Sequence, residues 1–444
     1  VRIIDNIQPL REVIANLNEN HLDGFIELCE PKIYGELMTV VIKGAEDFVN
    51  YARSKVLTTY NYVVTKEIPL SPADFLQISS LEVGPVFLKS MEAISSALDV
   101  EYIISTRKID FYKIQNTVKE NDFGMGFHST TSFNLYIIGN QDNITAAETQ
   151  IRVVINTILN EFYVDTYEID LSLIPLLGGI DMLNFTQIAR QLDCNIYIPD
   201  LLPELLNSDL LANNRAMLVY ITAKEIASIH MAKYLLDDLK LKLVHSETSL
   251  VSKSVCMFKT KLDLMVLIDQ AYLLSIMFKY GVFIQLPSLG SLNDFEIQVQ
   301  GQFPESVMEA IHELCLLSSK YYQYTVKFDK SSISNSNQFD QLLSALASNE
   351  ERPTVTSSSE NGIEFFGTAE QLKHFVILLD TNFFKHFSAA VEMSFTLEIN
   401  NEHKDFISGK KNGKVMKVLN QLGQIPRIEF LAFNEEQFLL VFTV

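Results

Sequence analysis

Residues 166–199 read TYEIDLSLIPLLGGIDMLNFTQIARQLDCNIYIP, and this stretch decides the fold. It opens on a β-type run, TYEIDLS, and continues through apolar helical segments on either side of the pair Gly178 and Gly179. It closes on a second β-type run, CNIYIP. The predicted order is strand, helix, helix, strand, with the helices packed against the strands around an apolar core.

The elements that follow this stretch recur along the chain. A β-type run that leads at once into a helix appears five times, as MTVVIKGAEDFV from residue 38, FNLYIIGNQDNI from 133, MLVYITAKEIAS from 217, FEIQVQGQFPES from 295 and IEFFGTAEQLKH from 363. Four of these runs carry glycine at the turn, where glycine permits a positive φ or a tight bend: Gly44, Gly139, Gly301 and Gly367. The repeat predicts a β-α-α-β-β-α unit of about 75 residues, with a three-stranded sheet on three helices.

This order of elements resembles the type I KH (K-homology) module, and the chain is similar to multi-KH proteins of the vigilin-like and Bicaudal-C-like kind. The last unit carries the resemblance most clearly: MSFTLEI is similar to the first strand, NEHKDFIS to the first helix, GKKN to the loop and GKVMKVLNQL to the second helix. The strands PRIEFLAF and FLLVFTV follow. The resemblance implies an α+β fold, a tandem array of modules that each pack a three-stranded antiparallel sheet on three helices.

The pattern divides the chain into six units of unequal completeness. Polar and glycine-containing stretches in the second and fifth units are expected to form loops. The units are 1–61, a partial KH-like unit; 62–163, with an insertion at about 108–132; 164–246; 247–322, without a glycine loop; 323–389, which is abbreviated; and 390–444, with the GKKN loop but without the last helix.

The resemblance implies an RNA-binding site in the last unit. KH modules hold about four single-stranded nucleotides between the glycine loop and the sheet edge. Glycines let phosphates approach backbone N–H groups, and lysines add charge. Asn412 stands where the family has glycine, but asparagine tolerates left-handed geometry better than most residues. The candidate RNA-binding residues are Gly409, Lys410, Lys411, Asn412, Gly413, Lys414, Val415 and Arg427, with Ile428 and Phe430 as further candidates for an apolar floor.

The other units depart from this loop chemistry. The third unit keeps Gly178 and Gly179 but continues with Ile180 and Asp181, so that an acidic residue replaces a cationic one. The second unit has EVGPV around Gly84, and the fourth has LIDQAY without glycine. A phosphate backbone would meet carboxylates or bulky side chains there, which lowers affinity. We expect these units to be structural or to face protein partners.

Composition and charge narrow the class of protein. The chain has 444 residues, 48% of them apolar, and a formal net charge of −20, so a polyanion should be repelled except near a basic segment such as 401–420. The isolated cysteines lack metal or redox spacing, which predicts reduced core residues and a cytoplasmic protein. No apolar run is long enough to cross a membrane. The start at Val1, without a basic leader, suggests a piece of a longer protein.

The sequence offers little for catalysis. The eight histidines are scattered without metal-ligand spacing, and no nucleophile elbow, P-loop or dinucleotide fingerprint is present. We therefore expect no enzyme activity, no metal and no cofactor. Two hypotheses remain: an RNA-binding protein that contacts single-stranded RNA, mRNA in particular, mainly through the last unit, and a protein-interaction scaffold of degenerate KH modules without significant RNA binding.

Overall fold

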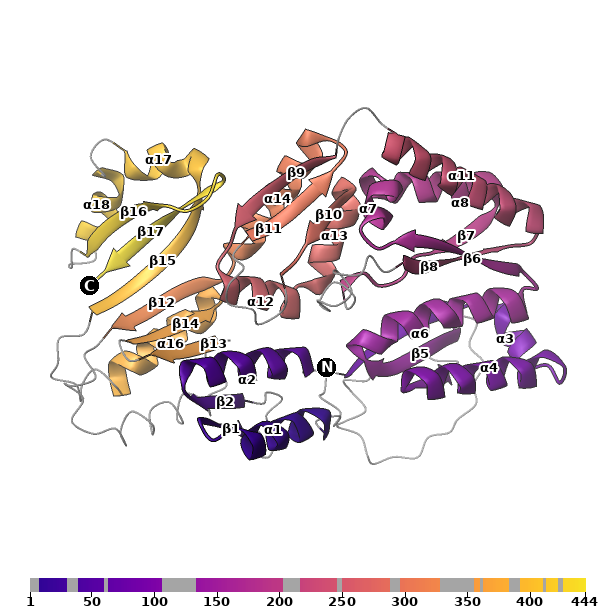
Figure 1. Cartoon of the computed structure of the whole chain (residues 1–444), viewed down its shortest axis with the longest axis horizontal. Coiled ribbons are helices and arrows are strands. Elements are labelled where there is room, and N and C mark those ends of the chain that lie inside the picture. Colours follow the sequence, from indigo (N-terminus) through magenta and orange to yellow (C-terminus); the bar gives the residue numbers. More distant parts are fainter. Residues whose placement is uncertain are drawn as a thin grey trace. The chain divides into compact units, whose positions relative to one another are not determined.

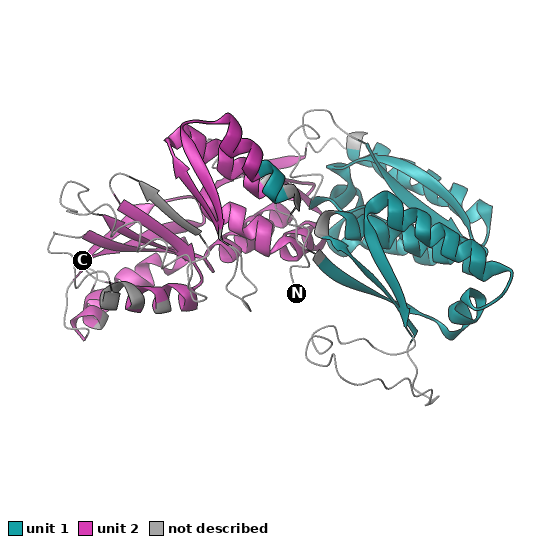
Figure 2. Cartoon of the chain, turned by 90° about the horizontal axis from the view of Figure 1, so that it is seen from below, with its two compact units in different colours: residues 1–13, 59–249 teal, residues 14–58, 250–444 magenta. Residues whose placement is uncertain are grey.

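The computed structural model describes residues 8–29, 39–59, 63–105, 133–202, 216–245, 250–287, 296–327, 355–359, 362–382, 392–409, 413–421 and 426–444 (Figure 1). These residues form small antiparallel sheets with helices packed on them, which confirms the predicted α+β class. The chain divides into two compact units, one of residues 1–13 and 59–249 and the other of residues 14–58 and 250–444 (Figure 2). The insertion predicted at about 108–132 lies outside the described residues, and the six unit boundaries stay predictions.

The first compact unit contains two modules of the predicted element order. One consists of β3 (Val63–Leu70), α3 (Pro72–Ile78), α4 (Val83–Leu98), β4 (Val100–Ser105), β5 (Phe133–Asn140), α6 (Gln141–Val154) and a π-helical turn, η1 (Ile155–Leu159). The other consists of β6 (Tyr163–Asp170), α7 (Leu173–Gly178), the 3-10 turn η2 (Ile180–Met182), α8 (Leu183–Leu192), β7 (Cys194–Tyr197), β8 (Ala216–Ala223) and α11 (Ile226–His245).

Both sheets place their last strand in the centre, in the orders β3-β5-β4 and β6-β8-β7. The central strands are the most deeply buried, because they carry apolar side chains such as Leu135, Ile137, Val219 and Ile221. In the first of these modules Phe87 and Met91 of α4 and Ile144 of α6 complete the core. The helices thus supply the apolar layer that each three-stranded sheet needs.

The second compact unit begins with a reduced module and continues with a full one. The boundary between the two compact units falls within α1 (Gln8–Asn20), which is followed by β1 (Gly24–Cys29), β2 (Thr39–Gly44) and α2 (Glu46–Thr59). The full module contains β9 (Val251–Cys256), α12 (Lys259–Ile268), α13 (Gln270–Tyr280), β10 (Val282–Gln285), β11 (Glu296–Gly301) and α14 (Pro304–Ser318).

The last two modules share one six-stranded sheet of order β13-β14-β12-β15-β17-β16. It is joined at its centre by antiparallel pairing of β12 with β15, in which Tyr324 lies opposite Phe395. The elements are β12 (Tyr322–Lys327), β13 (Val355–Ser359), β14 (Gly362–Gly367), α16 (Ala369–Asn382), β15 (Glu392–Asn400), the 3-10 turn η5 (Asn401–His403), α17 (Lys404–Ser408), α18 (Gly413–Asn420), β16 (Arg427–Ala432) and β17 (Gln437–Thr443).

Two of the four repeated glycines, Gly139 and Gly301, allow close packing and have no positive φ. Among the four, Gly44 alone has a positive φ, at 154°. A Cβ on Gly139 would lie 2.6 Å from Cγ1 of Val100 on the neighbouring strand, and a Cβ on Gly301 would lie 3.0 Å from Cγ1 of Val282. A positive φ, one of the two expected roles, is therefore absent at Gly139 and Gly301. A Cβ would crowd the adjacent strand at both positions, and at Gly301 it would also lie 2.9 Å from Cγ2 of Val307 on the following helix.

The second unit's glycine also has a different place from the one expected. Gly84 lies in the first turn of α4, and the link between α3 and α4 is Ser79–Glu82. A Cβ on Gly84 would lie 2.3 Å from the carbonyl oxygen of Ile78. Gly84 thus lets α4 pack against the end of α3 and does not form an open loop.

Among the described residues, no helix combines the length and apolar character that crossing a bilayer requires.

Candidate nucleic-acid interface

Gly409 ends the first helix of the C-terminal module in a conformation that suits glycine. Its φ is 59° and its ψ is −167°, and its N–H donates to the carbonyl oxygen of Asp405 at 3.0 Å, which closes α17. Other residues populate positive φ rarely, because the Cβ crowds the backbone. Gly413 then opens α18, and a Cβ placed there would meet nothing within 4 Å. Lys410, Lys411 and Asn412 lie outside the described residues.

The module at 163–245 uses the same backbone at the corresponding place. Gly179 caps α7 with φ 69° and ψ −171°, and its N–H donates to the carbonyl oxygen of Pro175 at 3.0 Å. The next residues diverge: Asp181 and Met182 both adopt φ of 54°, which non-glycine residues seldom do. The first glycine of the loop therefore has one structural role in two modules, whereas the charge that follows it differs.

The module at 251–318 has replaced the loop with a closed junction. Its first helix, α12, ends at Ile268 and α13 begins at Gln270, with Asp269 as the joining residue. The hydroxyl of Tyr321 donates to Oδ2 of Asp269 at 2.8 Å. Burial and the Asp269 carboxylate raise the pKa of Tyr321. A carboxylate therefore stands where a glycine loop would present N–H groups to a phosphate.

Three exposed lysines lie around the Gly409 loop. Lys404 and Lys414 sit on α17 and α18, and Lys417 is one turn further along α18. In the part of the chain that the structure describes, none of these ammonium groups pairs with a carboxylate. The Lys414 Nζ lies 3.6 Å from the centroid of the Phe406 ring, and the Lys404 Nζ lies 5.7 Å from that of Phe438. Glu402 and Asp405 on the same segment are also exposed, so three lysines against two carboxylates leave a small positive excess near Gly409 on an acidic chain.

The other candidate RNA-binding residues lie on the edge strand β16 and point to two opposite faces of the sheet. Phe430 stacks on Phe438, which is 1% exposed and belongs to the core, so Phe430 and Ile428 lie on the same, core side of the sheet. Arg427 alternates with them and therefore lies on the opposite face, where its guanidinium pairs with Glu429. The structure brings Gly409, Gly413, Lys414 and Val415 together but places Arg427 apart from them.

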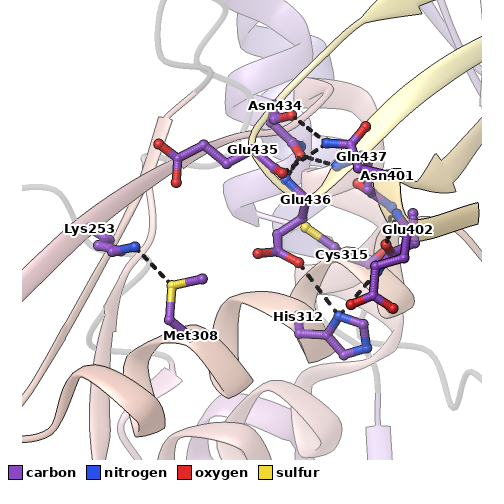
Figure 3. Close-up of polar contacts among 11 residues, drawn as sticks. Lys253, Met308, His312, Cys315, Asn401, Glu402, Asn434, Glu435, Glu436 and Gln437 are labelled. Carbon is purple, nitrogen blue, oxygen red and sulfur yellow. Dashed lines mark hydrogen bonds and ion pairs between the residues drawn. The ribbon is translucent and has the colours of Figure 1, made fainter. Parts of the chain in front are cut away.

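A polar turn attaches the C-terminal module to the module before the shared sheet (Figure 3). The side-chain amide of Asn434 donates to the carbonyl oxygen of Cys256 at 2.9 Å, and that of Gln437 donates to the carbonyl oxygen of Cys315 at 3.0 Å. Glu436 Oε2 lies 3.6 Å from Nδ1 of His312 on α14. These contacts position the Gly409 loop on a body larger than its own module.

A buried charged cluster reinforces this attachment. Nζ of Lys261 donates to Glu398 on β15 at 2.8 Å, and the hydroxyl of Ser318 donates to the other carboxylate oxygen at 2.7 Å. Lys261 is 1% exposed, and burial lowers its pKa while Glu398 opposes that shift. On the same helix α12, two residues after Lys261, Asp263 pairs with Arg53 of α2.

Sequence reasoning missed this cluster. The sequence did contain a hint of buried charge: a lysine and an aspartate lie inside the apolar segment KTKLDLMVLI, and a glutamate lies inside the strand MSFTLEI.

The fold and the loop define a protein built from KH modules, and comparison with known families agrees. Residues 252–322 match the Mug60/KHD4 KH type I domain family, and residues 388–443 match the family described as YLL032C fifth KH domain-like. The two matches identify KH modules in this chain, and the chain is similar to multi-KH proteins.

A curated relative extends the similarity to almost the whole chain. The K homology domain-containing protein 4 of Mycosarcoma maydis is 26% identical over 455 residues. That alignment covers 98% of this chain but 31% of the relative. The chain therefore spans about a third of the length of the relative that it matches.

Proposed function

We propose that this chain is a non-enzymatic, cytoplasmic RNA-binding protein whose C-terminal module makes the principal contact with single-stranded RNA. The contact runs through the Gly-Lys-Lys-Asn loop at 409–412, with Gly413, Lys414 and Val415 on the following helix. The remaining modules form a structural or partner-binding platform. Messenger RNA is the natural class of ligand, because it presents long unpaired segments.

One observation carries the proposal: Gly409 ends α17 with a positive φ of 59°, shortly before α18 begins at Gly413, and exposed lysines lie on both helices. Backbone N–H groups in a loop between helices can donate to phosphate oxygens, and lysines raise the local positive potential. The modules at 163–245 and 251–318 lack one or both features, because Asp181 follows Gly179 and Asp269 closes the other junction. RNA affinity should therefore concentrate in the C-terminal module.

The test is a titration of labelled, short, random single-stranded RNA into the full chain over a range of salt concentrations. The wild-type protein should bind with an affinity that falls as salt rises. The double change Lys410→Asp and Lys411→Asp should abolish binding without loss of folding. A matched control, Lys240→Asp with Lys242→Asp on α11 of the other compact unit, changes the net charge by the same amount and should bind nearly as well as wild type.

A second function is a protein scaffold that retains the KH fold without RNA affinity. The closed Asp269 junction and the overall charge of −20 support it. It predicts that wild type and the Lys410/Lys411 variant bind RNA equally weakly at every salt concentration. Equal loss in the two double variants would instead assign the wild-type binding to net charge alone, and would contradict a site at the loop.

A further inference from the structure

Phe406 and Lys414 form an exposed aromatic and cationic pair beside the loop glycine. Phe406 lies on α17 and is 71% exposed, although it is a large apolar side chain. The Nζ of Lys414 sits 3.6 Å from the ring centroid. A Cβ on Gly409 would lie 3.4 Å from Cγ of Lys414, so the lysine side chain passes directly beside the glycine on its way to the ring. Gly409, the Phe406 ring and the Lys414 ammonium therefore lie side by side.

In the module at 163–245, Gly179 has nearly the same backbone conformation as Gly409. The residues at the positions that correspond to Phe406 and Lys414 are nevertheless arranged differently. Asn184 lies five residues after Gly179, as Lys414 does after Gly409, and its amide donates to the carbonyl oxygen of Leu177 at 2.8 Å. Leu176 precedes Gly179 by three residues, as Phe406 precedes Gly409, and it is 1% exposed. Both positions are used internally in that module, whereas in the C-terminal module both side chains reach the surface.

An exposed ring beside a phosphate-binding loop matches the chemistry of single-strand recognition. Unpaired bases stack on aromatic side chains, and this contact accepts any base because every base has a π-face. An ammonium over an exposed ring is a weaker contact than a stacked base. A base can therefore take the place of the Lys414 ammonium on the ring, which leaves that ammonium available to a phosphate a short distance away.

We propose that Phe406 is a stacking platform for one nucleobase of the bound RNA, and that Lys414 contacts the phosphate of the same or the adjacent nucleotide. This inference rests on the proposed function, because the loop must first hold the strand. It adds a stacking contact to the proposed site, and it predicts that the base-dependent and charge-dependent parts of the affinity can be changed separately.

The experiment compares Phe406→Leu, Phe406→Tyr and a control, Phe303→Leu, in the full chain. Phe303 is another exposed phenylalanine, 54% exposed, and lies at the start of α14. Binding of short random single-stranded RNA should weaken about 5- to 150-fold in Phe406→Leu, as expected for loss of one stacked base. Its salt dependence should stay unchanged, because no phosphate contact is lost. Phe406→Tyr and Phe303→Leu should bind like wild type.

A second readout reports stacking directly. RNA that carries 2-aminopurine at one position should lose fluorescence on binding to wild type and to Phe406→Tyr, and should lose much less with Phe406→Leu.

The outcomes separate this inference from the function on which it rests. Wild-type affinity and quenching in Phe406→Leu, together with loss of binding in the Lys410/Lys411 double variant, would overturn the stacking role and leave the RNA site intact. An equal loss in Phe406→Leu and Phe303→Leu would overturn it as well. Absence of RNA binding by wild type would overturn the proposed function and the inference together.

Discussion

The buried ion pair between Lys261 and Glu398 supports a direct test of how the second compact unit holds together. The two side chains belong to α12 and β15 and meet at 2.8 Å, with Ser318 as a further donor to the carboxylate. Removal of the carboxylate in Glu398→Ala leaves the Lys261 ammonium, 1% exposed, without a counter-charge. Breaking one side of a buried pair costs about 3–5 kcal/mol of unfolding free energy.

Native-state hydrogen exchange measures this loss where it occurs. Amides of α12 and β15 should lose protection by a factor of about 10² to 10⁴, which corresponds to that free energy. A matched control is Glu392→Ala on the same strand, because Glu392 pairs with Lys327 at 3.3 Å but 54% of its side chain is exposed. An exposed pair contributes about 0–1 kcal/mol, so the control should change protection little.

The direction of the pH dependence provides a second check on the same variant. Burial lowers the pKa of Lys261, and loss of Glu398 removes the charge that opposed this shift. The folded variant therefore sheds its proton more readily than the unfolded chain, so its stability should recover as pH rises towards the ordinary lysine pKa. The difference in unfolding free energy between wild type and Glu398→Ala should accordingly shrink above neutral pH.

Two results would refute this reasoning. The first is a loss of less than about 1 kcal/mol in Glu398→Ala, equal to the exposed control. The second is a triple variant, Lys261→Met with Ser318→Ala and Glu398→Leu, that is as unstable as Glu398→Ala. Replacement of all three polar groups by apolar ones removes the unpaired charge, and such replacements are often neutral or stabilising.

Three further changes test other parts of the structure. Gly409→Ala should cost about 1–2 kcal/mol, measured as lost amide protection in α17 and weaker RNA binding, because its φ is 59°, whereas Gly413→Ala should be neutral or slightly stabilising because the site is open and helical. Gly139→Ala should lower the melting temperature because its Cβ would lie 2.6 Å from Cγ1 of Val100, and Val100→Ala in the same chain should restore part of the loss. Cys315, whose pKa burial raises to about 12, should resist alkylation by iodoacetamide in the native protein at pH 8 and react once the chain is unfolded, as mass spectrometry would show.

The fold class was accessible from the sequence because its signals are local. The runs that begin at residues 133 and 217 form β5 and β8 followed by α6 and α11, and each three-stranded sheet has the same order of strands. Alternating β-type runs and helical spacing depend on neighbouring residues alone, so they can be read without the tertiary structure. The physical reason for the glycines could not be read in this way: Gly139 is required by Val100, which lies on another strand.

Contacts between modules were not accessible from the sequence. Lys261 and Glu398 are separated by 137 positions, and neither residue type predicts burial by itself. The pairing of β12 with β15 likewise joins two modules that the repeat treats as separate. Such contacts depend on the surfaces that meet after each module has folded, and the repeat pattern does not specify those surfaces.

These contacts bear on how the candidate RNA site works. Gly409 follows from β15 by way of η5 and α17, and β15 is held on one side by β12, while its Glu398 is held by Lys261. Asn434 and Gln437, at the turn before and at the start of β17, bond to the backbone at Cys256 and Cys315. These contacts hold β15, which precedes the segment that carries Phe406 and Gly409, and β17, which follows it, and on the proposed function such support reduces the ordering that RNA binding must supply. The module at 251–318, which lacks the glycine loop, can therefore contribute to the proposed affinity through the support that it gives to the C-terminal module.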